Sequence, residues 1–397
     1  MRVSTSGAYS SGLSAMQRLQ TALDQTQRQI SSGRRILTPS DDPLAAARAL
    51  EIRESIGRLE QFDRNANIVN GRLAQEESSL GSVNNVLQRV RELALQANNA
   101  TQSNESRRLI AIEMRQNLDQ LVQIANQKDG NGSYLFSVNL DSTTPVTRMG
   151  AAFEYDGDQG QRYIQIGEGR QVADGDSGAA IFFNIRNGNG SFSTTAVVGN
   201  SGTGILGPGS VTDPSVWDQG QYTVRFIDST SYEVLDASAA VVSSGTFQPG
   251  DTLAFRGIEF SLDGEPAAGD EFSISPSAYQ DVFSMVDQLA STLEQGGTDV
   301  ASQAVVNNGI NTALQNIDQA IGNILDVRIQ VGSRLAAIEN QVDSNGAFAL
   351  NYRETLASIE DLDYAEALSR LSLEVTTLEA AQQSFIRTQS LSLFNYF

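Results

Sequence analysis

The sequence predicts a multidomain α+β protein, with long N- and C-terminal helices paired in a coiled-coil-like bundle and an all-β domain inserted between them. Three observations predict this class. Apolar residues recur every seven positions near both ends of the chain of 397 residues. Residues 140–276 are rich in glycine, aspartate and serine, and their apolar residues come in short runs. Helical periodicity then returns. A sustained seven-residue repeat forms a narrow apolar seam on a helix, and that seam needs another helix to cover it.

The heptad columns define two long central helices, expected at residues 44–97 and 299–343. Asp42 is placed to cap the first of these helices, and Pro43 can occupy its first position. Gly57, Gly71 and Gly81 could bend or interrupt it. We expect the two columns to bury each other within one subunit. Their members are Ile52, Leu59, Ala66, Leu73, Leu80, Leu87 and Ala94 in the first helix, and Ile310, Ile317, Ile324, Val331 and Ile338 in the second.

The remaining elements follow from periodicity and turn residues. Further helices are expected at residues 1–33, 104–128, 277–294 and from 351 towards the end, and a short strand at 134–136. Between them, apolar runs separated by turns such as Asn187-Gly188-Asn189-Gly190 predict a β-sandwich or barrel.

These elements group into three expected domains. Residues 1–43 with 346–397 would form a terminal helical assembly domain. Residues 44–139 with 277–345 would form a helical bundle, and residues 140–276 the inserted β domain.

Composition excludes several classes of function. The formal net charge is −20, which argues against binding to nucleic acid or to an anionic membrane surface. The chain has no cysteine and no histidine, so disulfides, thiolate nucleophiles, Ser-His-Asp triads and zinc sites of the usual kind are absent. The polar start shows no apolar signal segment, and no run is long and apolar enough for a membrane span. We expect no cofactor.

Clustered carboxylates are the remaining candidates for chemistry. Asp156-Gly157-Asp158 and Asp174-Gly175-Asp176 could hold calcium, but tight turns are favoured because neither continues into a complete calcium-binding loop. Glu76 and Glu77 interrupt an apolar seam. Neighbours in sequence point to different faces of a helix, so a solvated or arginine-paired face is favoured over an acid–base pair. We therefore expect no catalytic and no metal-binding residues.

The two ends of the chain are expected to be surfaces for self-association that stay poorly ordered until assembly. Residues 1–50 hold six arginines and three aspartates, so 6 − 3 = +3, and residues 359–397 hold two arginines and six carboxylates, so 2 − 6 = −4. Opposite charges favour pairing of the first and last helices. Their apolar side chains exceed what one helix pair can cover. The predicted interface residues are Met16, Leu19, Leu23, Ile30, Leu371, Val375, Leu378, Phe385, Leu391 and Phe394.

The loop after the first helix carries a family resemblance. The run Ile-Ser-Ser-Gly-Arg-Arg-Ile-Leu-Thr-Pro-Ser-Asp-Asp-Pro-Leu-Ala-Ala at residues 30–46 resembles the bacterial flagellin superfamily. Its Gly-Arg-Arg and Asp-Asp-Pro versions are similar to the hook-associated protein 3 family within it. Residues 129–137 are also similar to that family, although Val138 stands where the family usually has glycine. The resemblance adds Arg34, Arg35, Asp41 and Asp42 to the expected interface.

The resemblance implies a structural subunit rather than an enzyme. It implies export through the flagellar type III apparatus without signal cleavage, and an extracellular ring of subunits at the junction between hook and filament. The implied partners are other copies of the chain, hook-associated protein 1, flagellin and a cytosolic export chaperone that holds the C-terminal helix.

Two alternatives remain open at this point. The chain could be filament flagellin itself, since the terminal pattern is shared. The β domain could instead carry an enzymatic or glycan-binding site, for which Asp174, Asp176 and Trp217 are the hints.

Overall fold

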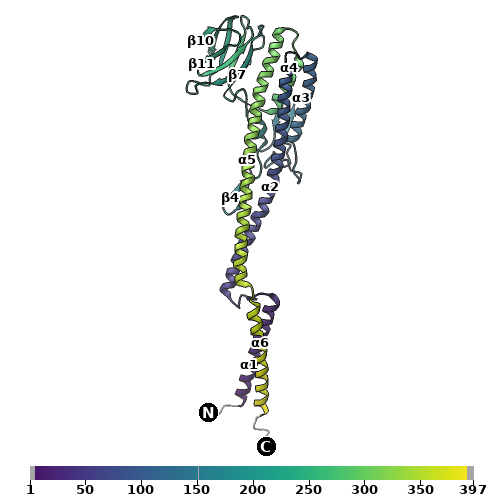
Figure 1. Cartoon of the computed structure of the whole chain (residues 1–397), viewed down its shortest axis with the longest axis vertical. Coiled ribbons are helices and arrows are strands. Elements are labelled where there is room, and N and C mark those ends of the chain that lie inside the picture. Colours follow the sequence, from purple (N-terminus) through teal and green to yellow (C-terminus); the bar gives the residue numbers. More distant parts are fainter. Residues whose placement is uncertain (1–4, 151, 391–397) are drawn as a thin grey trace. The chain divides into compact units, whose positions relative to one another are not determined.

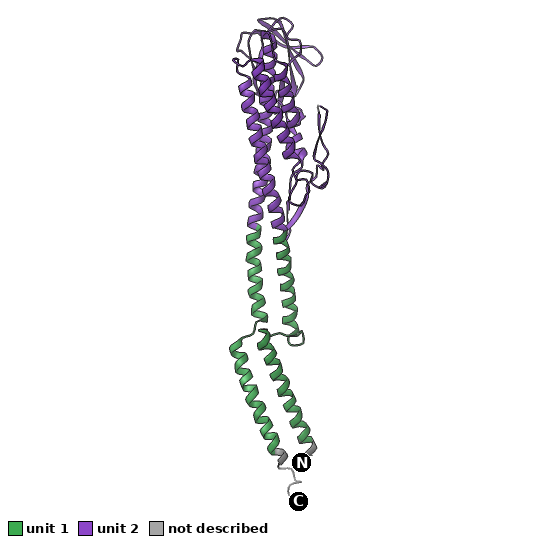
Figure 2. Cartoon of the chain, turned by 90° about the vertical axis from the view of Figure 1, so that its right-hand side faces the viewer, with its two compact units in different colours: residues 1–64, 341–397 green, residues 65–340 purple. Residues whose placement is uncertain are grey.

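The computed structural model describes residues 5–150 and 152–390, and the chain forms two compact units (Figures 1 and 2). Unit 1 comprises Met1–Arg64 and Gln341–Phe397, and unit 2 comprises Asn65–Asn340. Two long helices contribute to both units. The division into three domains stays a prediction.

The helices lie at the two ends of the sequence and the strands in its middle, which confirms the predicted fold class (Figure 1). The helices are α1 (Thr5–Ser32), α2 (Pro43–Ala97), α3 (Asn104–Ala125), α4 (Val282–Gln295), α5 (Val300–Glu360) and α6 (Tyr364–Ser390), with a short π-helix, η1, at Ala179–Phe183.

Helix α2 runs without a break through the three glycines that could have interrupted it. A Cβ at Gly57, Gly71 or Gly81 would meet nothing within 4 Å, so these glycines serve no close packing contact. The predicted start of the helix is confirmed. Asp42 Oδ1 accepts a hydrogen bond from the Ala45 amide at 3.0 Å, which satisfies one of the unpaired donors of the first turn.

The C-terminal helices differ from the prediction. A break was expected between residues 343 and 351, but α5 continues to Glu360, and the chain turns only at residues 361–363. Asn345 explains the continuity. Its side chain is buried and donates to Asp63 Oδ1 on α2 at 3.2 Å, so it does not compete for the backbone of its own helix.

The heptad columns are buried within unit 2, as predicted. Leu73, Leu80 and Leu87 on α2 have 0% of their surface exposed, as do Ile310 and Ile317 on α5. Ion pairs join the two helices at two levels: Arg91–Asp318 at 2.6 Å and Arg328–Glu77 at 2.6 Å. On the other side of the bundle, Arg115 of α3 bonds to Asp287 and Glu294 of α4.

The first part of the β-rich region consists of small hairpins beside the helices. Strands β1 (Val146–Met149) and β2 (Ala152–Tyr155) form one antiparallel pair, and β3 (Tyr163–Gly167) and β4 (Arg170–Ala173) form another. Strand β5 (Ile185–Arg186) pairs with β14 (Tyr279–Gln280), so α4 starts at Val282 and not at residue 277. The strand expected at residues 134–136 is absent. Tyr134 makes only an isolated bridge with Lys128.

The second part is a β-sandwich. A five-stranded antiparallel sheet has the order β10-β9-β8-β13-β6, and a three-stranded sheet the order β11-β12-β7. Both sheets contribute to one core rich in phenylalanine, including Phe226, Phe260 and Phe272. The strands are β6 (Phe192–Ala196), β7 (Ile205–Val211), β8 (Tyr222–Asp228), β9 (Ser231–Asp236), β10 (Val241–Thr246), β11 (Thr252–Phe255), β12 (Ile258–Asp263) and β13 (Glu271–Pro276).

Buried asparagines of α5 hold the sandwich against the helices. Asn308 accepts from the Leu206 amide at 2.7 Å and donates to the Gly204 carbonyl at 2.9 Å. Two turns later, Asn316 accepts from the Gly188 amide at 2.7 Å. These bonds replace the water that the edge of the sandwich would otherwise bind.

Candidate subunit interface

Helices α1 and α6 pack side by side in unit 1 and bury each other only in part (Figure 1). Phe385 lies against Gly12 and against the ring of Tyr9, with ring centroids 5.2 Å apart. A hydrogen bond from Thr26 Oγ1 to Glu374 Oε1 at 3.3 Å also crosses the pair. The predicted seam residues Met16, Leu19, Leu23, Ile30, Leu371, Leu378 and Phe385 are all half-buried.

A second apolar stripe of α6 lies beside the face that packs on α1, and its side chains remain exposed. Leu368, Val375 and Ile386 are separated by seven and eleven residues, so they lie on one side of the helix. They are 53%, 39% and 63% exposed. Of the predicted interface residues, Val375 belongs to this stripe, whereas Leu391 and Phe394 lie outside the described residues. The helix pair therefore leaves an apolar surface to which a further helix could bind.

The unit 1 portions of α2 and α5 also expose apolar side chains. Ile52 and Leu59 are only half-buried here, although the same column is fully buried in unit 2. Leu44, Leu50, Phe348 and Leu350 are each more than half exposed. The sequence did not indicate this part of the candidate interface, because a heptad column does not show where its covering helices end.

Two linkers connect the helices of unit 1 and bond to each other. Arg34 forms an antiparallel bridge with Asp361, the Leu362 amide donates to the Gly33 carbonyl at 3.0 Å, and the Arg35 amide donates to the Glu360 carbonyl at 2.7 Å. Gly33 has a φ of +70°, and a Cβ there would lie 2.9 Å from the hydroxyl of Tyr364. The loop therefore needs glycine for both its conformation and its close contact.

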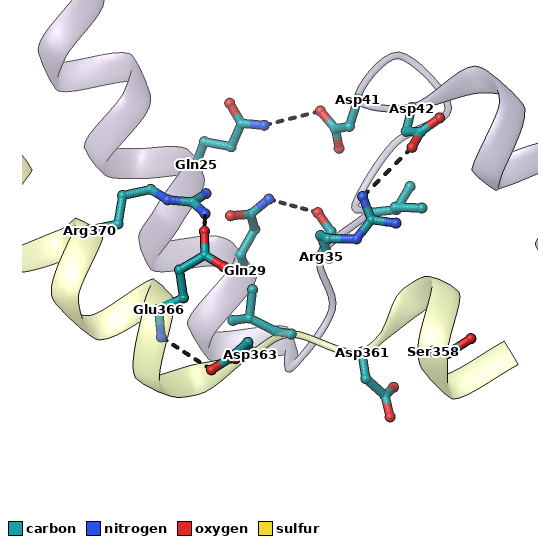
Figure 3. A pocket seen from close by; sticks show the side chains of 12 residues that line it. Gln25, Gln29, Arg35, Asp41, Asp42, Ser358, Asp361, Asp363, Glu366 and Arg370 are labelled. Carbon is teal, nitrogen blue, oxygen red and sulfur yellow. Dashed lines mark hydrogen bonds and ion pairs between the residues drawn. The ribbon is translucent and has the colours of Figure 1, made fainter. Parts of the chain in front are cut away.

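The charged residues of this loop have partners within the subunit (Figure 3). Arg35 donates from Nη2 to the Ile359 carbonyl at 2.7 Å and lies 3.7 Å from Asp42. Asp41 Oδ2 accepts hydrogen bonds from the Thr38 and Leu37 amides. These two bonds lower the pKa of Asp41, and the bond from Thr38 has the larger effect. Arg35, Asp41 and Asp42 thus shape the loop. Contacts of these residues and of the exposed Arg34 with a neighbouring subunit stay a prediction.

A polar hollow of about 430 Å³ lies between the two linkers. Figure 3 shows Gln25 pointing to Asp41, and Arg370 paired with Glu366. Within residues 5–150 and 152–390, no group of three or more aspartates and glutamates is arranged to hold a metal ion. The same part of the chain contains no helix long and apolar enough to cross a membrane.

The carboxylates that the sequence offered as calcium ligands have other partners. Arg162 Nη2 lies 2.6 Å from Asp174, and Arg334 bonds to Asp176 through both terminal nitrogens at 2.8 and 2.9 Å. Glu77 pairs with Arg328, as the arginine-paired interpretation predicts. Glu76 differs from that prediction: it is neither solvated nor on a surface, and has 1% of its surface exposed. Trp217, the hint of a glycan site, packs its ring against Phe192 and Tyr222.

Comparison with known proteins relates the chain to components of the bacterial flagellum. The bacterial flagellin N-terminal helical region matches residues 3–140, and the bacterial flagellin C-terminal helical region matches residues 314–397. Flagellar hook-associated protein 3 of Salmonella typhimurium is 22% identical over 99% of both chains. Phase 1 flagellin of Salmonella naestved is 36% identical, but over only 30% of this chain and 23% of its own.

Solved structures agree with the full-length relative. The crystal structure of FlgL from Xanthomonas campestris has a TM-score of 0.73 and 33% identity, covering 77% of this chain and 99% of that one. The flagellar junction protein FlgL from Legionella pneumophila has a TM-score of 0.69 and 33% identity, covering 73% and 98%. With one third of the residues identical over almost the whole of both solved chains, this chain belongs to the flagellar hook-associated protein 3 (FlgL) family of the bacterial flagellin superfamily.

Proposed function

We propose that the protein forms a ring of subunits between hook-associated protein 1 and the first flagellin subunits. Its family consists of structural junction proteins of the flagellum, and flagellin itself matches only in part. The observation that carries the ring is the incompletely covered α1–α6 pair, whose stripe at Leu368, Val375 and Ile386 needs neighbours.

Each part of the chain has a separate role in this proposal. Residues 1–43 with 346–397 would assemble with neighbouring subunits, and the exposed apolar residues of α2 and α5 in unit 1 would continue that contact. Residues 44–139 with 277–345 would give each subunit a stiff bundle, because the apolar columns of α2 and α5 within unit 2 are already buried. Residues 140–276 would be the outer domain.

The route to the flagellum is part of the proposal. We infer export through the flagellar type III apparatus without removal of a signal peptide, so that the protein acts outside the cell. Before export, a cytosolic chaperone would cover the apolar side of α6. The charged and aromatic residues that could have served catalysis or glycan binding have structural partners, which supports a role without enzymatic activity.

Deletion of the gene tests the junction role. A strain without this protein should build hooks but no filaments, and should release flagellin monomers into the medium, because flagellin would have no surface on which to start. A matched strain that carries the gene on a plasmid should regain filaments. Normal filaments in the deletion strain would contradict the proposal. The flagellin alternative predicts instead that the purified protein grows long filaments by itself.

A further inference from the structure

A buried cluster of charged residues connects the chain near Asp129 and at residues 174–176 to the long helices in unit 2. Arg72 of α2 lies 3.3 Å from Asp129 and 3.9 Å from Asp174, and Arg334 of α5 holds Asp176. The side chains of Asp174 and Asp176 are 4% and 7% exposed. The cluster thus joins three segments that are distant in sequence.

Two polar atoms inside this cluster have no hydrogen-bond partner among the protein groups. One is Arg72 Nε, a donor, and the other is Glu76 Oε2. The side chain of Arg72 is 9% exposed. The other carboxyl oxygen of Glu76, Oε1, accepts from the Asp176 amide at 3.2 Å. Buried polar groups are almost always paired, so two such atoms close together point to a bound molecule.

Gly175 marks the place where that molecule fits. A Cβ on Gly175 would have three nearest neighbours, all of them polar: Arg72 Nε at 3.5 Å, Glu76 Oε2 at 3.6 Å and the Leu135 carbonyl oxygen at 3.9 Å. The Leu135 oxygen accepts one bond from Arg72 Nη2 at 3.2 Å and has a second lone pair. One donor and two acceptors therefore converge on the space beside a glycine.

We propose that this space binds one structural water molecule, which accepts from Arg72 Nε, donates to the Leu135 carbonyl and makes its third hydrogen bond with Glu76 Oε2. The donor set matches water, which can accept and donate at once. A cation is disfavoured by the guanidinium group of Arg72, and an anion by Glu76, Asp174 and Asp176. Water also reverses its bond to Glu76 when that carboxyl is protonated, which a fixed ion cannot do.

The proposed water explains why residue 175 is glycine. Gly175 does not have a φ in the left-handed region, so its backbone would accept alanine. The distances at its Cβ position are ordinary contacts, so a methyl group would fit without a clash. Gly175 is required because a methyl group would occupy the volume of the water and leave Arg72 Nε and Glu76 Oε2 unpaired.

Crystallography of the full chain at atomic resolution tests the site directly. The wild type should show a density peak within hydrogen-bonding distance of Arg72 Nε, Glu76 Oε2 and the Leu135 oxygen. In Gly175→Ala this peak should be absent. No peak in the wild type, or a peak that persists in the variant, would overturn the proposal.

Thermal unfolding supplies the second measurement, with Gly130→Ala as the matched control. Gly130 is in the same segment, has no left-handed φ and would meet nothing within 4 Å with a Cβ. We expect Gly130→Ala to leave the melting temperature unchanged or slightly higher. Gly175→Ala should lower it by on the order of 3 °C, because two buried groups lose a partner. Equal melting temperatures for the two variants would overturn the assignment of the water to these groups.

Discussion

Single residues in the apolar seam carry the polar connection between the β-rich region and the helices. Glu76 occupies a position where the heptad pattern calls for an apolar side chain, yet it is buried beside Arg72 and Asp176. Removing one member of such a cluster leaves its charged partner buried and unpaired, which is more costly than the pair is stabilising. These residues are therefore sensitive to substitution although they are remote from the candidate interface.

The protonation of Glu76 predicts a dependence of stability on pH. Burial, followed by the nearby charge of Asp176, raises the pKa of Glu76 to about 8. The groups that face it are Arg72 from α2, Arg334 from α5 and Asp176 from the loop. Because the folded state holds this proton at higher pH than the unfolded chain does, its contribution is complete below about pH 4.5 and is lost as pH rises through 8.

We therefore expect the melting temperature of the wild type to fall by on the order of 5 °C between pH 6 and pH 9. Glu76→Gln, which keeps a neutral polar group of the same size, should show a smaller loss over the same interval. Calorimetric scans at several pH values measure both. Glu77→Gln serves as control, and parallel curves for wild type and Glu76→Gln would refute the prediction.

At the scale of the element, α6 presents three different faces. One packs on α1 through Leu371, Leu378 and Phe385, and a second exposes Leu368, Val375 and Ile386. The third is polar and exposed, and includes Ser369, Thr376 and Gln383. A helix with two apolar sides and one partner in the subunit is suited to packing among several neighbours.

A charge in the seam should separate assembly from folding. Leu378→Asp places a carboxylate on the half-buried face that packs on α1. We expect at least a tenfold loss of filament-bearing cells, because assembly would bury this charge without a partner, at a cost of several kcal/mol. Unit 2 should still unfold as in the wild type, because its seams are independent of α6. Electron microscopy of complemented cells and circular dichroism of the purified protein are the measurements.

Thr376→Asp is the control for this variant, since it adds the same charge on the polar face. It should assemble normally. If both variants fail, the charge and not the seam is responsible, and the role given to Leu378 is wrong.

At the scale of the whole molecule, the two units differ in how completely their helices are covered. Unit 2 has a fully buried apolar column on each long helix, joined by ion pairs, whereas the seams of α1 and α6 are half-buried throughout. Helical stability comes mainly from packing of the apolar face, so the terminal helices are the less stable elements of the subunit.

Hydrogen exchange of the monomer measures this difference. Amides of α1 and α6 should exchange at least a hundredfold faster than those of α2 and α5 within residues 65–97 and 300–340, and should become protected on assembly. The buried amides of the sandwich core serve as an internal reference. Equal protection of α6 and of α5 in unit 2 in the monomer would contradict assembly-coupled ordering.

The sequence by itself determined the order of elements, since periodicity, caps and turn residues are local. The heptads located α2 and the buried columns, and Asp42 and Pro43 marked the start of α2. The sequence also showed that the first and last helices carry more apolar residues than one helix pair can cover, because composition can be counted without knowledge of the fold.

Only the tertiary structure decided where local signals are overruled. Asn345 resembles a helix end, but its bond to Asp63 on another helix allows α5 to continue. Glu76 resembles a surface residue, but Arg72, Asp176 and Arg334 from three segments surround it. The physical reason is the same for both: a polar side chain adopts the environment that provides its partners, and those partners lie far away in the sequence.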